Sequence, residues 1–311
     1  MKSTTRFSGV WVPLITPFQF NAQDPAEAGA VDLATAQRLA RFYADAGVAG
    51  LVVCGTTGEA ATLSPTEQHA LLSAVLEAVQ GRCPVMMGVA GNHTDALAQR
   101  VRLLDGFDLA GLLISPPAYV KPSQAGIIAD YLMLASATRH PIVLYNIPSR
   151  TGVNMTPVTV AKLVATGRFP AIKESAGDVP QMLNLLEIPQ LDVLCGDDIL
   201  LLASLLMGAS GTICASAHIR PDLFVALYQQ VRQGRGAAAM ALFQQLKPLI
   251  ETLFSEPNPA PLKAALAQQG WLRETLRLPM TPVSEACNQN LALQLERVMK
   301  LEKVGVSALA A

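Results

Sequence analysis

Charge of either sign is scarce in this chain of 311 residues: only 15% of the residues are charged, and the net charge at pH 7 is −1. Nucleic-acid binding needs a stripe of Lys and Arg, and here these residues are scattered along the sequence. We therefore expect no nucleic-acid partner. Hydrophobic residues, in contrast, make up 51% of the chain, which is enough for a large core and excludes a disordered protein.

Cysteine and histidine are also scarce, and neither is spaced as metal ligands are. The cysteines are odd in number and most lie in or beside apolar runs, which predicts reduced thiols in the core of a cytoplasmic protein. The histidines are isolated from one another, so we expect surface or helix-capping positions and no metal centre. These residues are Cys54, Cys83, Cys195, Cys214 and Cys287, and His69, His93, His140 and His218.

Long uninterrupted apolar segments are nearly absent. The N-terminal stretch "MKSTTRFSGVWVPLITPF" is interrupted by Pro13 and Pro17 and lacks the apolar core of a signal peptide. Residues 199–217 carry no charge, but Gly208 and Gly211 divide them into a short helix, a turn and a strand. We therefore expect a cytoplasmic protein with no membrane association.

What the sequence does contain is a series of short apolar segments separated by helical patterns. Such segments suit strands that are buried on both faces. Strands that alternate with helices in this number predict an α/β protein with a (β/α)₈ TIM barrel. The predicted strands cover residues 9–16, 50–55, 84–89, 111–115, 141–146, 171–174, 192–196 and 211–215.

Helix signals are clearest after the second predicted strand. Ser64 can serve as the N-cap, Pro65 fits the first helical position, and Glu67 completes a capping box. Beyond the eighth strand, helical patterns continue to the C-terminus. We therefore divide the chain into a barrel that carries the active site, residues 1–235, and a small C-terminal helical domain, residues 236–311.

Candidate functional residues follow the predicted strands, because the active site of a TIM barrel lies at the C-terminal ends of its strands. The second strand is followed by "GTTGEA", in which Gly55 and Gly58 allow backbone N–H groups to approach a ligand. Thr56 and Thr57 add hydroxyls, so this loop can hold a small carboxylate. The alternative is a tight turn that the threonine side chains stabilise.

The fifth and sixth predicted strands end in further reactive side chains. Tyr145 offers a hydroxyl and Arg150 a fork suited to a second carboxylate; the alternatives are a satisfied core hydroxyl and a surface arginine. Lys173 alone among the lysines falls in a strand-like apolar run. Burial disfavours its ammonium form, so its amine can attack a ketone and form a Schiff base. The alternative is a structural lysine paired with Glu174, although adjacent strand residues point to opposite faces.

Together these groups suit the reaction of an α-keto acid with an aldehyde. Lys173 would form an iminium with the keto group, and loss of a methyl proton would give an enamine that attacks the aldehyde. Tyr145 and Thr56 would move the protons. We expect this chemistry to need no cofactor.

At these residues the sequence resembles the pyruvate-dependent class I aldolases of the dihydrodipicolinate synthase and N-acetylneuraminate lyase superfamily, and it is most similar to the synthases. The resemblance covers nearly the whole chain. Its motifs are "GTTGEAATL" (55–63), "YNIPSRTG" (145–152), "IKESAGD" (172–178), "GDD" (196–198), "EPNP" (256–259) and "LRLPMTP" (276–282).

The resemblance implies catalytic roles for four residues. Lys173 would be the Schiff-base lysine and Tyr145 the proton shuttle. Thr56 would link Tyr145 to a second tyrosine from a neighbouring subunit, for which Tyr119 is the match. A shared site of this kind implies a homodimer or homotetramer.

The resemblance also implies how substrates bind. Thr57 and Gly55 would bind the carboxylate of pyruvate, Arg150 that of the aldehyde, and Gly196 and Ile213 would complete the pocket wall. The reaction would join pyruvate to L-aspartate 4-semialdehyde, giving 4-hydroxy-tetrahydrodipicolinate in lysine and diaminopimelate biosynthesis. The alternatives are a pyruvate-type aldolase or dehydratase for a different aldehyde, sugar acid or hydroxy-keto acid, or a non-catalytic barrel.

Some residues depart from the pattern of the family. Pro65, Gln68 and Ala118 differ from lysine-inhibited relatives, which argues against feedback inhibition by lysine. Ala118 and Val120 lie where the aldehyde should enter, which keeps a different aldehyde open. Residues 19–32 form a longer connection than the resemblance implies, and we expect them to cover or reshape the barrel mouth.

Overall fold

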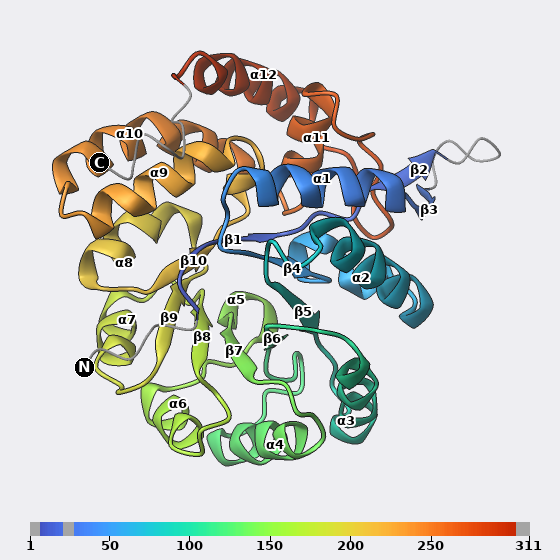
Figure 1. The fold of residues 1–311 in the computed structure, drawn as a ribbon, viewed down its shortest axis with the longest axis vertical. Coiled ribbons are helices and arrows are strands. Elements are labelled where there is room, and N and C mark those ends of the chain that lie inside the picture. The colour runs from blue at the N-terminus through green and yellow to red at the C-terminus, as the bar shows by residue number, and fades with distance from the viewer. Residues whose placement is uncertain (1–6, 21–27, 303–311) are drawn as a thin grey trace. The chain divides into compact units, whose positions relative to one another are not determined.

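The computed structural model describes residues 7–20 and 28–302, and its main feature is a closed barrel of eight parallel strands (Figure 1). The strands are hydrogen-bonded in the order β1-β10-β9-β8-β7-β6-β5-β4. Each lies inside a predicted segment, so the expected TIM barrel is confirmed. The strands are β1 (Gly9–Pro13), β4 (Gly50–Val53), β5 (Val85–Val89), β6 (Gly111–Ile114), β7 (Ile142–Asn146), β8 (Ala171–Glu174), β9 (Asp192–Cys195) and β10 (Gly211–Ile213).

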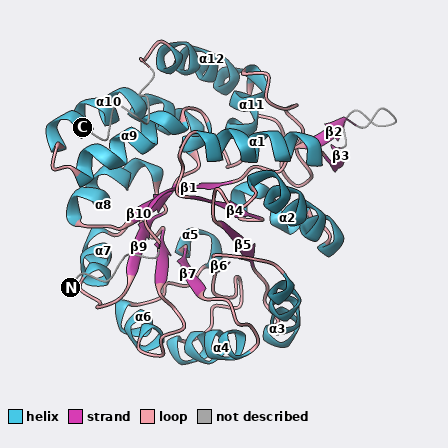
Figure 2. Cartoon of the chain, viewed as in Figure 1, coloured by secondary structure: helices cyan, strands magenta, loops and turns pink. Residues whose placement is uncertain are grey.

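The apolar character of these strands follows from their burial. Every residue of β1, β4, β5, β6, β7, β8 and β10 is buried. Strands of a parallel barrel are covered on both faces, so neither face selects for polar residues and the usual alternation is lost. The helices that connect the strands are visible around them in Figure 2.

The chain divides into two compact units, and the first comprises Met1–Gly9 and Pro84–Ile213. In the uncharged stretch 199–217, a short helix ends at Gly208, whose φ of 113° few other residues adopt, and a strand follows, as predicted. No described helix is long and apolar enough to cross a membrane. The helices of this unit are α3 (Thr94–Leu103), α4 (Gln124–Ser136), α5 (Pro148–Thr151), α6 (Pro157–Val164), α7 (Val179–Leu186) and α8 (Leu201–Met207).

The second unit comprises Val10–Cys83 and Cys214–Ala311. Its helix α2 begins as predicted: the Ser64 hydroxyl accepts from the Glu67 N–H, the Glu67 carboxylate accepts from the Ser64 N–H, and Pro65 is the first residue. The helices of this unit are α1 (Leu33–Asp45), α2 (Pro65–Val79), α9 (Pro221–Arg232), α10 (Gly236–Leu253), α11 (Ala260–Gln268) and α12 (Glu285–Met299). The C-terminal helices are thus present, and the domain boundary at residue 235 stays a prediction.

The longer connection predicted at residues 19–32 contains a short antiparallel sheet of β2 (Phe18–Phe20) and β3 (Ala28–Val31). These two strands were not predicted, because each is too short to show a clear pattern in the sequence. Residues 21–27 lie outside the described part of the chain, so an effect of this segment on the barrel mouth stays a prediction.

The cysteines lie as predicted, whereas two of the histidines do not. All five cysteines are free and buried, as predicted. His93 caps α3, with its Nδ1 accepting from the Ala96 N–H at 3.3 Å. His140 and His218, however, are buried, so their prediction as surface residues was wrong, although the His140 Nε2 lies 3.1 Å from the carbonyl of Leu104, the C-cap of α3. The His218 Nε2 accepts from the Ile15 N–H at 3.1 Å, and burial lowers the pKa of His218 to about 4.

Candidate active site

Tyr145 and Lys173 lie side by side at the ends of β7 and β8. They occupy the same register position of the two paired strands. The Lys173 Nζ lies 4.4 Å from the centre of the Tyr145 ring, and each residue is only 8% exposed. The structure therefore places the predicted nucleophile and the predicted proton shuttle next to each other, with both side chains largely shielded from solvent.

Glu174 points away from Lys173, as expected for neighbouring residues on one strand. Asn146 Nδ2 donates to both Glu174 carboxylate oxygens at 3.1 Å, and the Ala176 N–H and the Gln181 side chain donate to the same group. Burial raises the Glu174 pKa to about 7. The alternative of a structural Lys173–Glu174 ion pair is therefore not what the structure shows.

This hydrogen-bond network extends to the loop that follows β7. Asn146 accepts from the Met155 N–H at 3.0 Å and donates to Asn154 at 2.7 Å, and Asn154 donates to Gln181 at 2.8 Å. The loop with Arg150 is therefore anchored at its far end. Sequence reasoning missed this network. The signal in the sequence was a polar residue directly after each inward-facing residue: Asn146 follows Tyr145, and Glu174 follows Lys173.

Gly196 supplies the space that the Lys173 side chain occupies. A Cβ built at Gly196 would lie 2.6 Å from the Lys173 Cε and 2.0 Å from the Ser175 Oγ, far inside van der Waals contact. Any other residue there would displace the lysine. Ile213, the last residue of β10, is fully buried.

Arg150 and Tyr119 are exposed and belong to neighbouring loops. Arg150 lies on the four-residue helix α5, and the Tyr119 N–H donates to the Thr151 carbonyl at 3.1 Å. Tyr119 has a φ of 69° and is 89% exposed. Within the described part of this chain, the structure does not bring the Tyr119 side chain to Lys173.

The GTTGEA loop of the second unit forms a 3₁₀ turn over Thr56–Gly58. The Gly58 and Glu59 N–H groups are used inside the turn, but those of Thr56 and Thr57 donate to no other described residue. A Cβ at Gly58 would lie 2.9 Å from the Leu14 carbonyl, so this glycine is needed for packing, and its predicted role toward a ligand stays a prediction.

Two residues of the C-terminal part contact this loop, and sequence reasoning missed both. Asn258, in the EPNP motif, donates from Nδ2 to the Thr57 hydroxyl at 3.1 Å. Lys263 forms a 2.5 Å ion pair with Glu59, and both side chains are almost fully buried. Burial lowers the pKa of Lys263 to about 8, although the Glu59 carboxylate opposes the shift. The signal was a lysine among alanines and leucines in "APLKAALAQ".

Comparison with known proteins shows the family of the chain. A model of the dihydrodipicolinate synthetase family matches residues 6–298. The chain belongs to this family. The 4-hydroxy-tetrahydrodipicolinate synthase 2 of Clostridium acetobutylicum is 35% identical over 289 residues, which cover 92% of this chain and 98% of the relative. The 4-hydroxy-tetrahydrodipicolinate synthase of Prochlorococcus marinus is 38% identical over 293 residues, which cover 93% and 95%.

A solved structure of the same family resembles the whole chain. The chloride-inhibited dihydrodipicolinate synthase of Acinetobacter baumannii, complexed with pyruvate, has a TM-score of 0.89 and 29% identity, and the match covers 94% of this chain and 99% of the other. The family expected from the motifs is thus confirmed, and with it the enzyme class, a class I aldolase of the lyase type.

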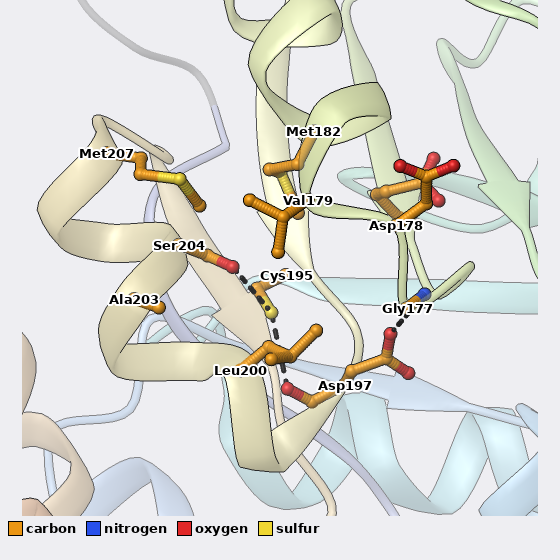
Figure 3. Close-up of a pocket in the computed structure, with 11 residues that line it drawn as sticks. Gly177, Asp178, Val179, Met182, Cys195, Asp197, Leu200, Ala203, Ser204 and Met207 are labelled. Atoms are coloured by element: carbon orange, nitrogen blue, oxygen red, sulfur yellow. Dashed lines mark hydrogen bonds between the residues drawn. The ribbon is translucent and has the colours of Figure 1, made fainter.

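A small pocket of this family member is lined by Glu174 and Asp197 but not by Lys173 itself. Figure 3 shows it between α7 and α8, where Ser204 donates to the Cys195 thiol at 3.2 Å and Gly177 donates to Asp197 at 3.0 Å. Its volume of about 10 Å³ is no more than one water needs. Burial raises the pKa of Cys195 to about 12, so this thiol is not reactive.

Proposed function

We propose that this chain condenses pyruvate with L-aspartate 4-semialdehyde to 4-hydroxy-tetrahydrodipicolinate, as a class I aldolase that forms a Schiff base at Lys173. The observation that carries the proposal is the buried Lys173 amine, which lies over the Tyr145 ring and forms no ion pair among the described residues. Relatives named as 4-hydroxy-tetrahydrodipicolinate synthases, matched over nearly their whole length, support the choice of reaction.

Lys173 is the nucleophile in this proposal. Its amine attacks the keto carbon of pyruvate, and loss of water gives an iminium that draws electrons from the adjacent methyl group. Loss of a methyl proton gives an enamine, whose carbon attacks the aldehyde carbon of the semialdehyde. The amino group of the semialdehyde then displaces the lysine and closes the ring.

Tyr145 moves protons at the Lys173 nitrogen. Its ring lies against the amine, so its hydroxyl belongs to the same buried cluster. We assign the continuation of the proton path to Thr56 and to Tyr119 of a neighbouring subunit, because Tyr119 is exposed and its hydroxyl has no partner among the described residues. This role requires a homodimer or homotetramer.

The GTTGEA loop binds the carboxylate of pyruvate. The Thr56 and Thr57 N–H groups are without partners among the described residues, and Gly55 leaves the backbone uncovered. Asn258 occupies one lone pair of the Thr57 hydroxyl, so the hydroxyl hydrogen is free to donate to the carboxylate. In this proposal the carboxylate of pyruvate accepts hydrogen bonds from the Thr56 N–H, the Thr57 N–H and the Thr57 hydroxyl.

Arg150 binds the carboxylate of the semialdehyde. Its guanidinium is exposed on α5, and a planar fork binds a carboxylate through two parallel hydrogen bonds. Gly196 and Ile213 complete the pocket wall, with Gly196 leaving room for Lys173. We expect the enzyme to act in the cytoplasm.

Reductive trapping tests the proposal. Pyruvate and borohydride should add the mass of a reduced pyruvate adduct to the peptide that contains Lys173, while the peptide with the ion-paired Lys263 serves as an internal control and stays unmodified. No adduct at Lys173 would refute the mechanism. Turnover of aspartate semialdehyde is then compared with that of other aldehydes at saturating pyruvate, and a background rate for the semialdehyde would favour a paralogous aldolase.

A further inference from the structure

Ser175 holds a buried hydroxyl that the mechanism above does not use. It follows β8 two residues after Lys173, so its side chain points to the same side of the barrel wall. Ser175 is 6% exposed, and its Oγ makes no hydrogen bond to any described residue. A buried hydroxyl without a partner is unfavourable, so such groups are rare, and a catalytic role is one of the reasons for which they are retained.

The Ser175 hydroxyl is a neighbour of the Lys173 side chain. Both surround the point where a Cβ on Gly196 would lie, with the Ser175 Oγ at 2.0 Å and the Lys173 Cε at 2.6 Å from it. The backbone on both sides is fixed, because the Ser175 N–H donates to the Asn146 carbonyl at 2.9 Å and the Gly196 N–H donates to the Glu174 carbonyl at 2.8 Å. The hydroxyl is therefore held beside the reacting lysine.

Other buried polar groups of this region have partners. On the outer face of the same strand, the Glu174 carboxylate receives several hydrogen bonds. Ser204, also a buried serine, donates to the Cys195 thiol (Figure 3). Glu174 and Ser204 thus have hydrogen-bond partners within the chain, whereas the Ser175 hydroxyl on the lysine side has none among the described residues.

We propose that the Ser175 hydroxyl donates a hydrogen bond to the keto oxygen of pyruvate while Lys173 forms the Schiff base. This proposal rests on the proposed function. When the Lys173 nitrogen bonds to the keto carbon, the C=O π electrons move to the oxygen, and a donor fixed beside it stabilises that developing charge. One proton passes from the Lys173 nitrogen to this oxygen and Tyr145 delivers a second. The C–O bond then breaks to release water, and the nitrogen lone pair forms the double bond to carbon.

The test is the rate of adduct formation in single-turnover reactions with pyruvate, quenched with borohydride and followed by intact mass. Ser175→Ala should lower the rate at saturating pyruvate roughly 100- to 1,000-fold, as expected for a lost oxyanion donor. The pyruvate concentration for half-saturation should change little. Ser204→Ala, which also removes a buried serine hydroxyl, should react like the wild type.

The possible outcomes separate the two proposals. If the adduct forms equally fast in the wild type and in Ser175→Ala, the proposed role of Ser175 is wrong and the proposed function still stands. A raised half-saturation concentration with an unchanged rate overturns it too, because Ser175 would then only bind substrate. A lowered Tm for Ser175→Ala, with an unchanged rate, would show a structural role. Failure of the wild type to form any adduct refutes both proposals.

Discussion

Substitution of the buried Glu174 by Gln should change how the stability of the protein depends on pH. Burial raises the pKa of this carboxyl from its ordinary value of 4.5 to about 7. Below pH 4.5 it is protonated in both the folded and the unfolded chain and has no effect. Between pH 4.5 and 7 the unfolded chain loses the proton while the folded chain retains it, so the free energy of unfolding falls as pH rises.

The size of this loss follows from the pKa difference. Each unit of pKa difference corresponds to about 1.4 kcal/mol, so the wild type should lose about 3 kcal/mol of stability through Glu174 between pH 4.5 and pH 8. Glu174→Gln carries no charge at any pH and lacks this contribution. Groups that do not interact with Glu174, such as His218, titrate alike in both proteins and cancel in the difference.

Urea unfolding of both proteins between pH 4.5 and pH 8, at one protein concentration, measures the effect. The free energy of unfolding of the wild type minus that of Glu174→Gln should fall by about 3 kcal/mol across this range. Glu187→Gln, at an exposed position in the same region, is the control and should give a curve parallel to the wild type. Parallel curves for Glu174→Gln and wild type would refute the reasoning.

Three further substitutions test the site. Arg150→Ala should leave the borohydride-trapped pyruvate adduct at Lys173 intact and raise the KM of the semialdehyde roughly tenfold, as expected for a lost charge-assisted hydrogen bond; equal loss of adduct and turnover would contradict the separate roles. Gly196→Ala should abolish adduct formation while circular dichroism shows an intact fold, because the added Cβ overlaps the lysine; an active variant would contradict this. Asn258→Ala should raise the KM of pyruvate several-fold with a smaller change in kcat, because the Thr57 hydroxyl loses its orientation; an unchanged KM would show that Asn258 does not position Thr57.

The sequence alone predicted the strands and the lysine because both are local signals. Continuous apolar runs are typical of strands buried on both faces, and Lys173 is conspicuous inside one. The position of Tyr145 beside Lys173 follows from the predicted order of the strands, because the two residues end successive strands and the strands of a barrel end at a common rim. These predictions needed no knowledge of contacts between distant residues.

What the sequence did not predict depends on contacts that are far apart along the chain. Asn258 and Thr57 are separated by 201 residues, and no local pattern indicates that they meet. The burial of His218 likewise depends on its contact with Ile15, 203 residues away. The β2–β3 sheet was missed for another reason: three or four residues are too few to establish a period of two.

The contacts of Asn258 and Lys263 limit how this protein can be shortened. A fragment that ends at residue 235 would retain every strand of the barrel, yet it would lose the partner of the Thr57 hydroxyl and the counter-ion of Glu59. Glu59 would then be a buried charge without compensation, in the loop assigned to pyruvate. The smallest active truncation should therefore extend beyond Lys263, even though Lys173, the proposed nucleophile, lies ninety residues earlier.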